Sequence, residues 1–158
     1  IPVATSGGVY LTVRDEDKQK LLPIARKLEN MGFKLFATPG TSDILRKNSV
    51  NVSTAYRINE KGHPDALDLM HQGKIQFIVN VPTISGGAVR DGNIMRRLAV
   101  EMNIPFVTTI SGAEMEVSAI SEARKDSLKP IKLQVNYLNL LPKNKNITKN
   151  SSKHLGQT

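Results

Sequence analysis

The sequence predicts an α/β fold in which a five-stranded parallel sheet lies between two layers of helices. Two observations predict it. Short apolar segments alternate five times with segments whose apolar residues recur at helical spacing, as in doubly wound sheets. The segment 75–81 (IQFIVNV) is almost continuously apolar, as expected of a central parallel strand that helices cover on both faces. The expected strand order is 3-2-1-4-5.

The first half of the chain holds three predicted strands and two predicted helices. The strand Gly8–Val13 precedes a helix that begins at Asp15 and carries apolar residues at helical spacing until a glycine ends it. Residues 33–37 (FKLFA) form the second strand, and residues 39–47 form the next helix, with a proline in its first turn. Residues 52–58 form the third and most polar strand.

The second half repeats the alternation. Pro64 suits the first position of a helix that ends before Gly73. The remaining predicted elements follow in the order strand 75–81, glycine-rich loop 85–87, helix 93–102, strand 105–108 and helix 113–125.

The 158 residues suit one domain with a single core. We expect this domain to cover residues 1–142, followed by a polar, basic and disordered tail over residues 143–158. The chain begins at Ile1 with no methionine and no signal peptide, so we interpret it as a piece cut from a longer protein. The absence of cysteine excludes disulfides and thiolate metal sites and fits a reducing, cytoplasmic location. No segment is long and apolar enough to span a membrane.

The formal net charge of +8 does not by itself indicate nucleic-acid binding. Half of it lies in the predicted tail, and the rest suits a small anionic ligand as well as a polymer. Basic residues do not alternate with aromatic ones as they do on surfaces that stack single strands. We therefore expect neither nucleic acid nor membrane as a partner.

Ligands of doubly wound sheets lie beyond the carboxyl ends of the strands, so the site is sought there. After the second strand, Thr38 suits an N-cap, Pro39 the first helical position, and Gly40 and Thr41 a close approach to a helix N-terminus. Backbone N–H groups and hydroxyls would then face an anion. Lys18, beside the neighbouring strand, would supply a cation. The alternatives are an ordinary capped helix and a solvated lysine.

Four further residues complete the predicted ligand site. Arg57 ends the third strand and has a planar group that suits a phosphate, although a surface arginine is an equal alternative. Asn80, Thr83 and the glycine-rich loop offer groups that read a ribose or base. Asp91 would accept from a ligand hydroxyl or cap the helix near Asn93.

Catalytic and metal-binding patterns are scarce. The three histidines are scattered, and no nucleophile elbow, Walker A or dinucleotide fingerprint occurs. We therefore predict no catalytic residue, no metal and no cofactor in this chain.

The segments that follow the predicted strands together resemble those of methylglyoxal-synthase-like domains. The resemblance is greatest to the version at the C-terminal end of the large subunit of carbamoyl-phosphate synthetase. The resemblance runs from about residue 8 to residue 120 and is specific because the blocks keep their order and spacing. It rests on residues 13–18 (VRDEDK), 32–41 (GFKLFATPGT), 62–64 (GHP), 80–82 (NVP), 90–91 (RD) with 96–99 (RRLA), 104–105 (IP) and 108–109 (TT).

The resemblance implies a non-catalytic allosteric domain that modulates carbamoyl phosphate synthesis for pyrimidine and arginine biosynthesis. The implied effectors are UMP or UTP as inhibitors and IMP as activator, with the phosphate on Lys18, Thr38 and Thr41. Arg57 falls where relatives have lysine, and an inserted residue near it and Pro82 depart from the family pattern. The implied partners are the other domains of the large chain, an ATP-dependent ligase that uses Mg or Mn, and the glutaminase small subunit.

The alternative is a true methylglyoxal synthase, a lyase acting on dihydroxyacetone phosphate. That reaction needs a carboxylate base beside the substrate carbon. His63 stands nearest to the family's base, and Ala88 near its histidine, so of the catalytic set only Asp91 remains. A regulatory domain is therefore favoured over the lyase and over a purely structural module.

Overall fold

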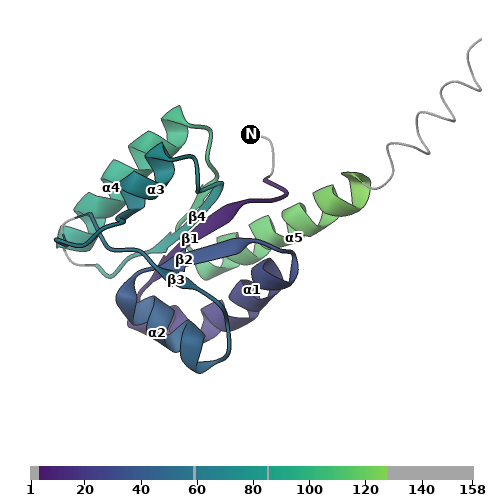
Figure 1. The fold of residues 1–158 in the computed structure, drawn as a ribbon, viewed down its shortest axis with the longest axis horizontal. Helices are drawn as coiled ribbons and strands as arrows, with labels where there is room; N and C mark the ends of the chain where they lie inside the picture. The colour runs from purple at the N-terminus through teal and green to yellow at the C-terminus, as the bar shows by residue number, and fades with distance from the viewer. Residues whose placement is uncertain (1–3, 59, 85, 128–158) are drawn as a thin grey trace, which may run out of the picture. The chain divides into compact units, whose positions relative to one another are not determined.

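Figure 1 shows the computed structural model, which describes residues 4–58, 60–84 and 86–127. The sheet has five parallel strands in the order β3-β2-β1-β4-β5, as predicted. The compact unit that contains it is Ile1–Arg124. The predicted domain boundary at residue 142 and the predicted tail lie outside the described residues. The strands are β1 Gly8–Val13, β2 Lys34–Ala37, β3 Ser53–Thr54, β4 Phe77–Val81 and β5 Phe106–Val107.

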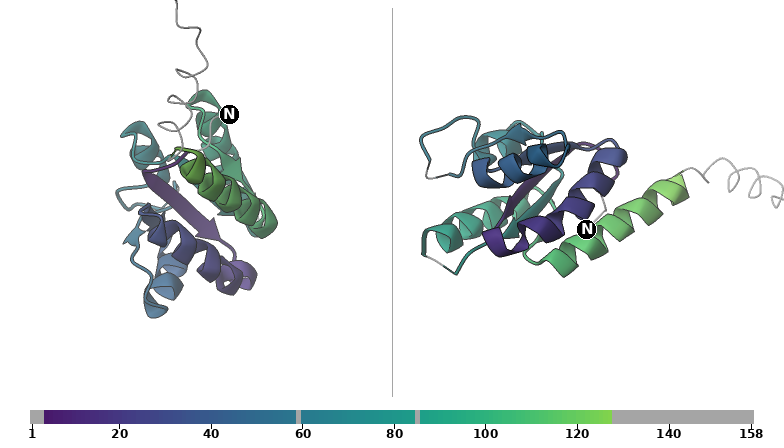
Figure 2. Two further views of the ribbon diagram at one scale, coloured as in Figure 1. Left: turned by 90° about the vertical axis from the view of Figure 1, so that its right-hand side faces the viewer. Right: turned by 90° about the horizontal axis from the view of Figure 1, so that it is seen from below.

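Helices cover both faces of the sheet (Figures 1 and 2). Side chains of α1, α2 and α5 share a buried apolar cluster with one face, and those of α3 and α4 share another with the opposite face. The helices are α1 Lys18–Asn30, α2 Pro39–Lys47, α3 Ala66–His71, α4 Gly86–Glu101 and α5 Ile110–Ser127, and a short 3-10 turn, η1, spans Asp15–Asp17.

The period of two along β1 assigns its side chains to these two clusters. Val9, Leu11 and Val13 pack against α1, α2 and α5, whereas Tyr10 packs toward α3 and α4. All six residues of β1 are buried, as expected of a strand with neighbours on both sides and helices on both faces. The same alternation positions one side of the candidate site, because Thr12 follows Tyr10 on the α4 face.

Several predicted element bounds differ from those in the structure. The third strand has only two residues, Ser53–Thr54, since the chain beyond it turns away and Tyr56 pairs in a single bridge with Asp65. Pro64 does not begin α3. Asp65 is the N-cap, and it forms a capping box with Asp68. The box satisfies the backbone N–H groups of Asp65 and Asp68, and the side chain of Pro64 has no acceptor that could do so.

The largest correction concerns α4, which begins at Gly86 instead of residue 93. The two glycines predicted to form a loop are its first turn. Glycine costs about 1 kcal/mol relative to alanine in a helix interior, which is why the pair predicted a loop. Asp91 and Gly92 are buried, and Gly92 lies against Asn80 of β4. The last helix also begins earlier than predicted, at Ile110, where the Thr109 hydroxyl accepts from the Gly112 N–H at 3.0 Å.

Candidate functional site

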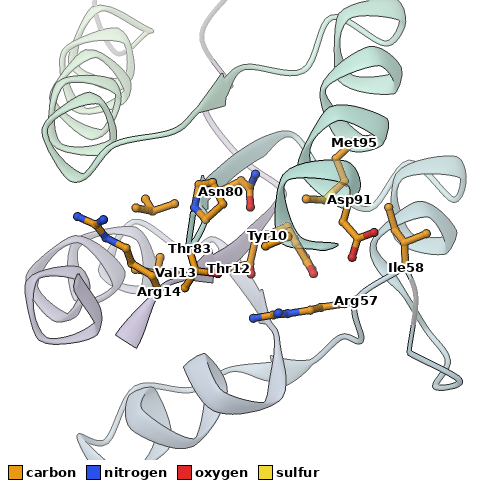
Figure 3. Close-up of a pocket in the computed structure, with 13 residues that line it drawn as sticks. Tyr10, Thr12, Val13, Arg14, Arg57, Ile58, Asn80, Thr83, Asp91 and Met95 are labelled. Atoms are coloured by element: carbon orange, nitrogen blue, oxygen red, sulfur yellow. The ribbon is translucent and has the colours of Figure 1, made fainter. Parts of the chain in front are cut away.

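A pocket lies between the α4 face of the sheet and α4, at the carboxyl ends of β1 and β4 (Figure 3). In this conformation it holds about 30 Å³, which suits a water molecule but not a nucleobase. A larger ligand therefore has to cover its mouth or displace exposed side chains such as Arg57. The lining residues are Tyr10, Thr12, Val13, Arg14, Arg57, Ile58, Asn80, Val81, Pro82, Thr83, Ala88, Asp91 and Met95.

Strand register brings the polar floor of this pocket together. Thr12 of β1 and Asn80 of β4 are directly paired, so their side chains stand side by side on the same face. Gly92 of α4 permits this arrangement, because a Cβ atom there would lie only 2.6 Å from Asn80 Nδ2. The pocket thus has a polar wall whose geometry the sheet fixes.

The charged groups that line the pocket come from different elements of the fold. Arg57, on the segment after β3, is exposed, and its guanidinium extends toward Thr12 and Tyr10 (Figure 3). Asp91 is buried on α4, and this burial raises the pKa of its carboxyl, an effect that Arg57 and Arg90 oppose. Burial likewise raises the pKa of the Tyr10 phenol, again against the influence of Arg57. The pocket therefore combines the exposed cation of Arg57 with two groups, Tyr10 and Asp91, whose pKa values burial raises.

A second group of polar atoms, here called the cradle, comprises Lys18, Thr38, Gly40 and Thr41 at the N-terminus of α2. Thr38 is the N-cap with an extended backbone, and Pro39 takes the first helical position, as predicted. Pro39 has no N–H, and Ser42 N–H donates to the Thr38 carbonyl at 2.8 Å. The N–H groups of Gly40 and Thr41 therefore lie outside the helical hydrogen-bond ladder.

The threonine hydroxyls of the cradle form a buried chain. Thr38 Oγ1 donates to Thr41 Oγ1 at 3.3 Å and lies 3.4 Å from Thr12 Oγ1, and Thr41 Oγ1 donates to the Val13 carbonyl at 3.4 Å. Thr38 makes no side-chain cap bond, contrary to the usual role of an N-cap threonine. Because Thr12 and Val13 also line the pocket, cradle and pocket adjoin across β1.

Lys18 is the first residue of α1, because the predicted helix start at Asp15 is instead the 3-10 turn η1. The Lys18 ammonium has a partner. Its Nζ bonds to Asp15 Oδ1 and also lies 2.9 Å from where a Cβ atom of Gly40 would stand. A cation thus faces the first turn of α2, where the helix dipole favours an anion. The arrangement can hold a phosphate between an ammonium, two backbone N–H groups and the threonines.

The eight predicted site residues therefore divide between two adjoining places. Lys18, Thr38, Gly40 and Thr41 form the cradle, whereas Arg57, Asn80, Thr83 and Asp91 line the pocket. The predicted capping role of Asp91 is wrong, since the residue lies inside α4.

Sequence reasoning missed Tyr10 and Thr12 on the pocket floor and Ile58 and Met95 at its sides. The alternating positions of β1 carried the signal for Tyr10 and Thr12.

One further cluster of side chains was not predicted. His63, Asp65 and Asp68 place potential metal-ligand atoms within 4.8 Å of one another, at the N-terminus of α3. Both carboxylates are engaged in the capping box, and His63 Nδ1 lies 2.7 Å from Asp68 Oδ2. The cluster does not line the pocket, and we interpret it as a structural tether of the β3–α3 segment.

An open, doubly wound sheet with a polar pocket at its carboxyl edge belongs to a class of α/β folds that place ligand sites at that edge. Comparison with known proteins gives its family. The family model described as the MGS-like domain matches residues 20–108, and the chain belongs to that family. Lys18 lies just before the matched residues.

Curated relatives connect this family member to one larger protein. The chain is 41% identical over 114 residues to the carbamoyl phosphate synthase large chain, C-terminal section, of Methanopyrus kandleri, covering 72% of this chain and 21% of the relative. It is 39% identical over 123 residues to the same section from Methanocaldococcus jannaschii, covering 77% and 20%. A Thermoplasma acidophilum carbamoyl phosphate synthase large chain is 37% identical over 75% of this chain and 11% of that protein. The chain thus spans about a tenth to a fifth of these relatives.

Solved structures share the fold. Methylglyoxal synthase from Elizabethkingia anophelis superposes with a TM-score of 0.55 and 17% identity, covering 73% of this chain and 80% of the other. ForH gives a TM-score of 0.54 and 15% identity, covering 76% and 82%. Within the described residues no helix is both long and apolar enough to cross a membrane.

Proposed function

We propose that this chain is the regulatory section of a carbamoyl phosphate synthase large chain and that it binds a phosphorylated nucleotide without catalysing a reaction. One observation carries the proposal: the Lys18 ammonium lies beside the first turn of α2, next to Thr38 and Thr41. An ammonium, a helix N-terminus and hydroxyls are the groups that proteins use for phosphate. The nucleoside would extend from this cradle toward Asn80, Thr83 and Asp91, with Arg57 closing over it.

The whole protein's activity is part of the same proposal. The curated relatives are large chains of carbamoyl phosphate synthase, so we infer that the remaining domains carry ATP-dependent synthesis with Mg or Mn and work with a glutaminase small subunit. Effector binding at this section would modulate that synthesis for pyrimidine or arginine production. Such an enzyme works in the cytoplasm.

The pocket supports regulation over lyase chemistry. A lyase of this family needs a carboxylate base near the substrate, and the nearest positional equivalent, His63, is 76% exposed and does not line the pocket. Ala88 lines the pocket but offers no titratable group. We therefore expect no release of inorganic phosphate from dihydroxyacetone phosphate above a heat-inactivated control, and measurable turnover would contradict the regulatory assignment.

Calorimetry of the 158-residue chain against UMP, UTP, IMP and dihydroxyacetone phosphate tests the binding proposal. Lys18→Ala should weaken nucleotide binding by about 10-fold or more, because a charge-assisted contact contributes about 1.5–3 kcal/mol. Lys20→Ala is the matched control, since that exposed lysine is two residues away and pairs with Asp17 at 3.7 Å. Equal losses in both variants, or none in either, would show that phosphate does not bind at the cradle.

A further inference from the structure

The ammonium group of Lys18 lies where two helix N-termini combine their positive charge. Lys18 begins α1, and its Nζ stands beside Gly40 in the first turn of α2. Each helix N-terminus carries the equivalent of about half a positive charge. The Lys18 side chain is only 14% exposed, so water screens this repulsion weakly. The position is therefore unfavourable for a cation unless an anion accompanies it.

Asp15 supplies that anion in the ligand-free chain. Its carboxylate forms an ion pair and a hydrogen bond with Lys18 Nζ, and Lys18 lowers the pKa of Asp15 below its ordinary value. The Asp15 side chain is 89% exposed, so it packs against little and can rotate away at small cost. The exposed anion of this pair is thus the partner that can be displaced, whereas the Lys18 side chain is largely buried.

The neighbouring carboxylate cannot take the same role. Asp17 is buried and accepts from Arg14 Nε at 2.6 Å, and it also pairs with Lys20 at 3.7 Å. Displacing it would break the hydrogen bond of a carboxylate whose side chain is only 8% exposed. Asp15 is therefore the exchangeable partner of Lys18, whereas Asp17 makes a structural contact with Arg14.

We propose that Asp15 is a built-in competitor for the phosphate site, one that occupies Lys18 until a phosphate group displaces it. The proposal rests on the proposed function and specifies how the cradle selects its ligand. A carboxylate ligand brings one negative charge and two oxygens, the same as Asp15 itself. A phosphate dianion brings a second charge and a third oxygen, so it can contact Lys18 and the N–H groups of Gly40 and Thr41 together and gains more than Asp15 loses. Asp15 thereby sets a threshold that favours phosphate esters over carboxylates.

The test measures inorganic phosphate and UMP binding by calorimetry at constant ionic strength. Asp15→Asn should tighten the binding of both by about two- to fivefold, the range expected when an exposed ion pair no longer competes. Glu16→Gln is the matched control, because it removes one exposed negative charge from the adjacent residue. In a Lys18→Ala background, Asp15→Asn should no longer tighten binding.

A second readout follows Asp15 directly. Carbon NMR of its carboxylate should show the pKa of Asp15 rising toward its ordinary value when saturating phosphate is added, since the released side chain loses Lys18.

Two outcomes would overturn the competitor role alone. In the first, the wild type binds phosphate and Asp15→Asn binds it with the same affinity. In the second, Glu16→Gln raises the affinity for phosphate as much as Asp15→Asn does. Failure of both wild type and Asp15→Asn to bind inorganic phosphate would remove the cradle itself and, with it, the proposed function.

Discussion

The cradle and the pocket adjoin across β1 but are built in different ways. The cradle draws three of its four residues from one stretch, Thr38 to Thr41, and its groups are backbone N–H, hydroxyl and ammonium. The pocket draws on β1, the segment after β3, β4 and α4, and it mixes aromatic, amide, carboxyl and guanidinium side chains. The cradle can therefore recognise charge, whereas the pocket can recognise shape and hydrogen-bond pattern.

This difference suggests a division of labour that mutation can test. If the cradle supplies affinity for phosphate, changes there should affect every phosphorylated ligand equally. If the pocket reads the nucleoside, changes there should affect nucleotides and spare inorganic phosphate. The expected effects decrease from the cradle to the pocket and then to the segment that supports Arg57.

The largest effect is expected from Gly40→Ala. The new Cβ atom would stand 2.9 Å from Lys18 Nζ, and the flexible ammonium must move away. Binding of inorganic phosphate and of UMP should both weaken by about 10-fold, as for a lost charge-assisted contact. Thermal stability should be unchanged or slightly higher, because alanine favours helices. Gly87→Ala is the control, since a Cβ atom there meets nothing within 4 Å.

Asn80→Ala should separate the two halves of the site. The amide lies on the pocket floor beside Thr12, so its loss should weaken UMP binding by about two- to tenfold, as for one neutral hydrogen bond. The affinity for inorganic phosphate should not change. Calorimetry measures both affinities, and Asn93→Ala, at an exposed position, is the control variant. Equal weakening for phosphate and UMP would mean that the halves do not act separately.

Asp91→Asn should alter the pH dependence of stability. Burial raises the folded-state pKa of Asp91, so its favourable contribution is present below the unfolded pKa and is lost as pH rises through the folded value. The asparagine variant should therefore gain stability relative to wild type as pH rises, by at most about 1 kcal/mol at neutral pH. Urea unfolding between pH 3 and pH 7 measures this, and a pH-independent difference would contradict the burial effect.

The smallest effect is expected from His63→Gln, in the segment that carries Arg57. Asp68 raises the folded-state pKa of His63 through their hydrogen bond. Its stabilising contribution should be present below the unfolded pKa and lost as pH rises through the folded pKa. Urea unfolding across this range should show a difference from wild type that disappears at high pH, whereas His71→Gln should not reproduce it. The effect is small because the pair is exposed to solvent.

The sequence predicted the local structure around the cradle more accurately than the local structure around the pocket. The second helix has the predicted bounds, because a proline at its first position and apolar residues at helical spacing are local signals. β1 also has its predicted bounds. The bounds of these elements depend on residues close in sequence, so they can be predicted without knowledge of the fold.

The tertiary structure alone decided which side chains line the pocket. Two glycines argued for a loop at the start of α4, yet packing of Asp91 and Gly92 against the sheet extends the helix through them. Tyr10 and Thr12 became site residues only when strand order put β4 beside β1. The ion pair of Lys18 with Asp15, by contrast, is local, because the two residues lie three apart in the sequence. Sequence spacing determines which elements form, but contacts between distant elements determine which side chains meet, because those contacts add free energy that local propensity does not contain.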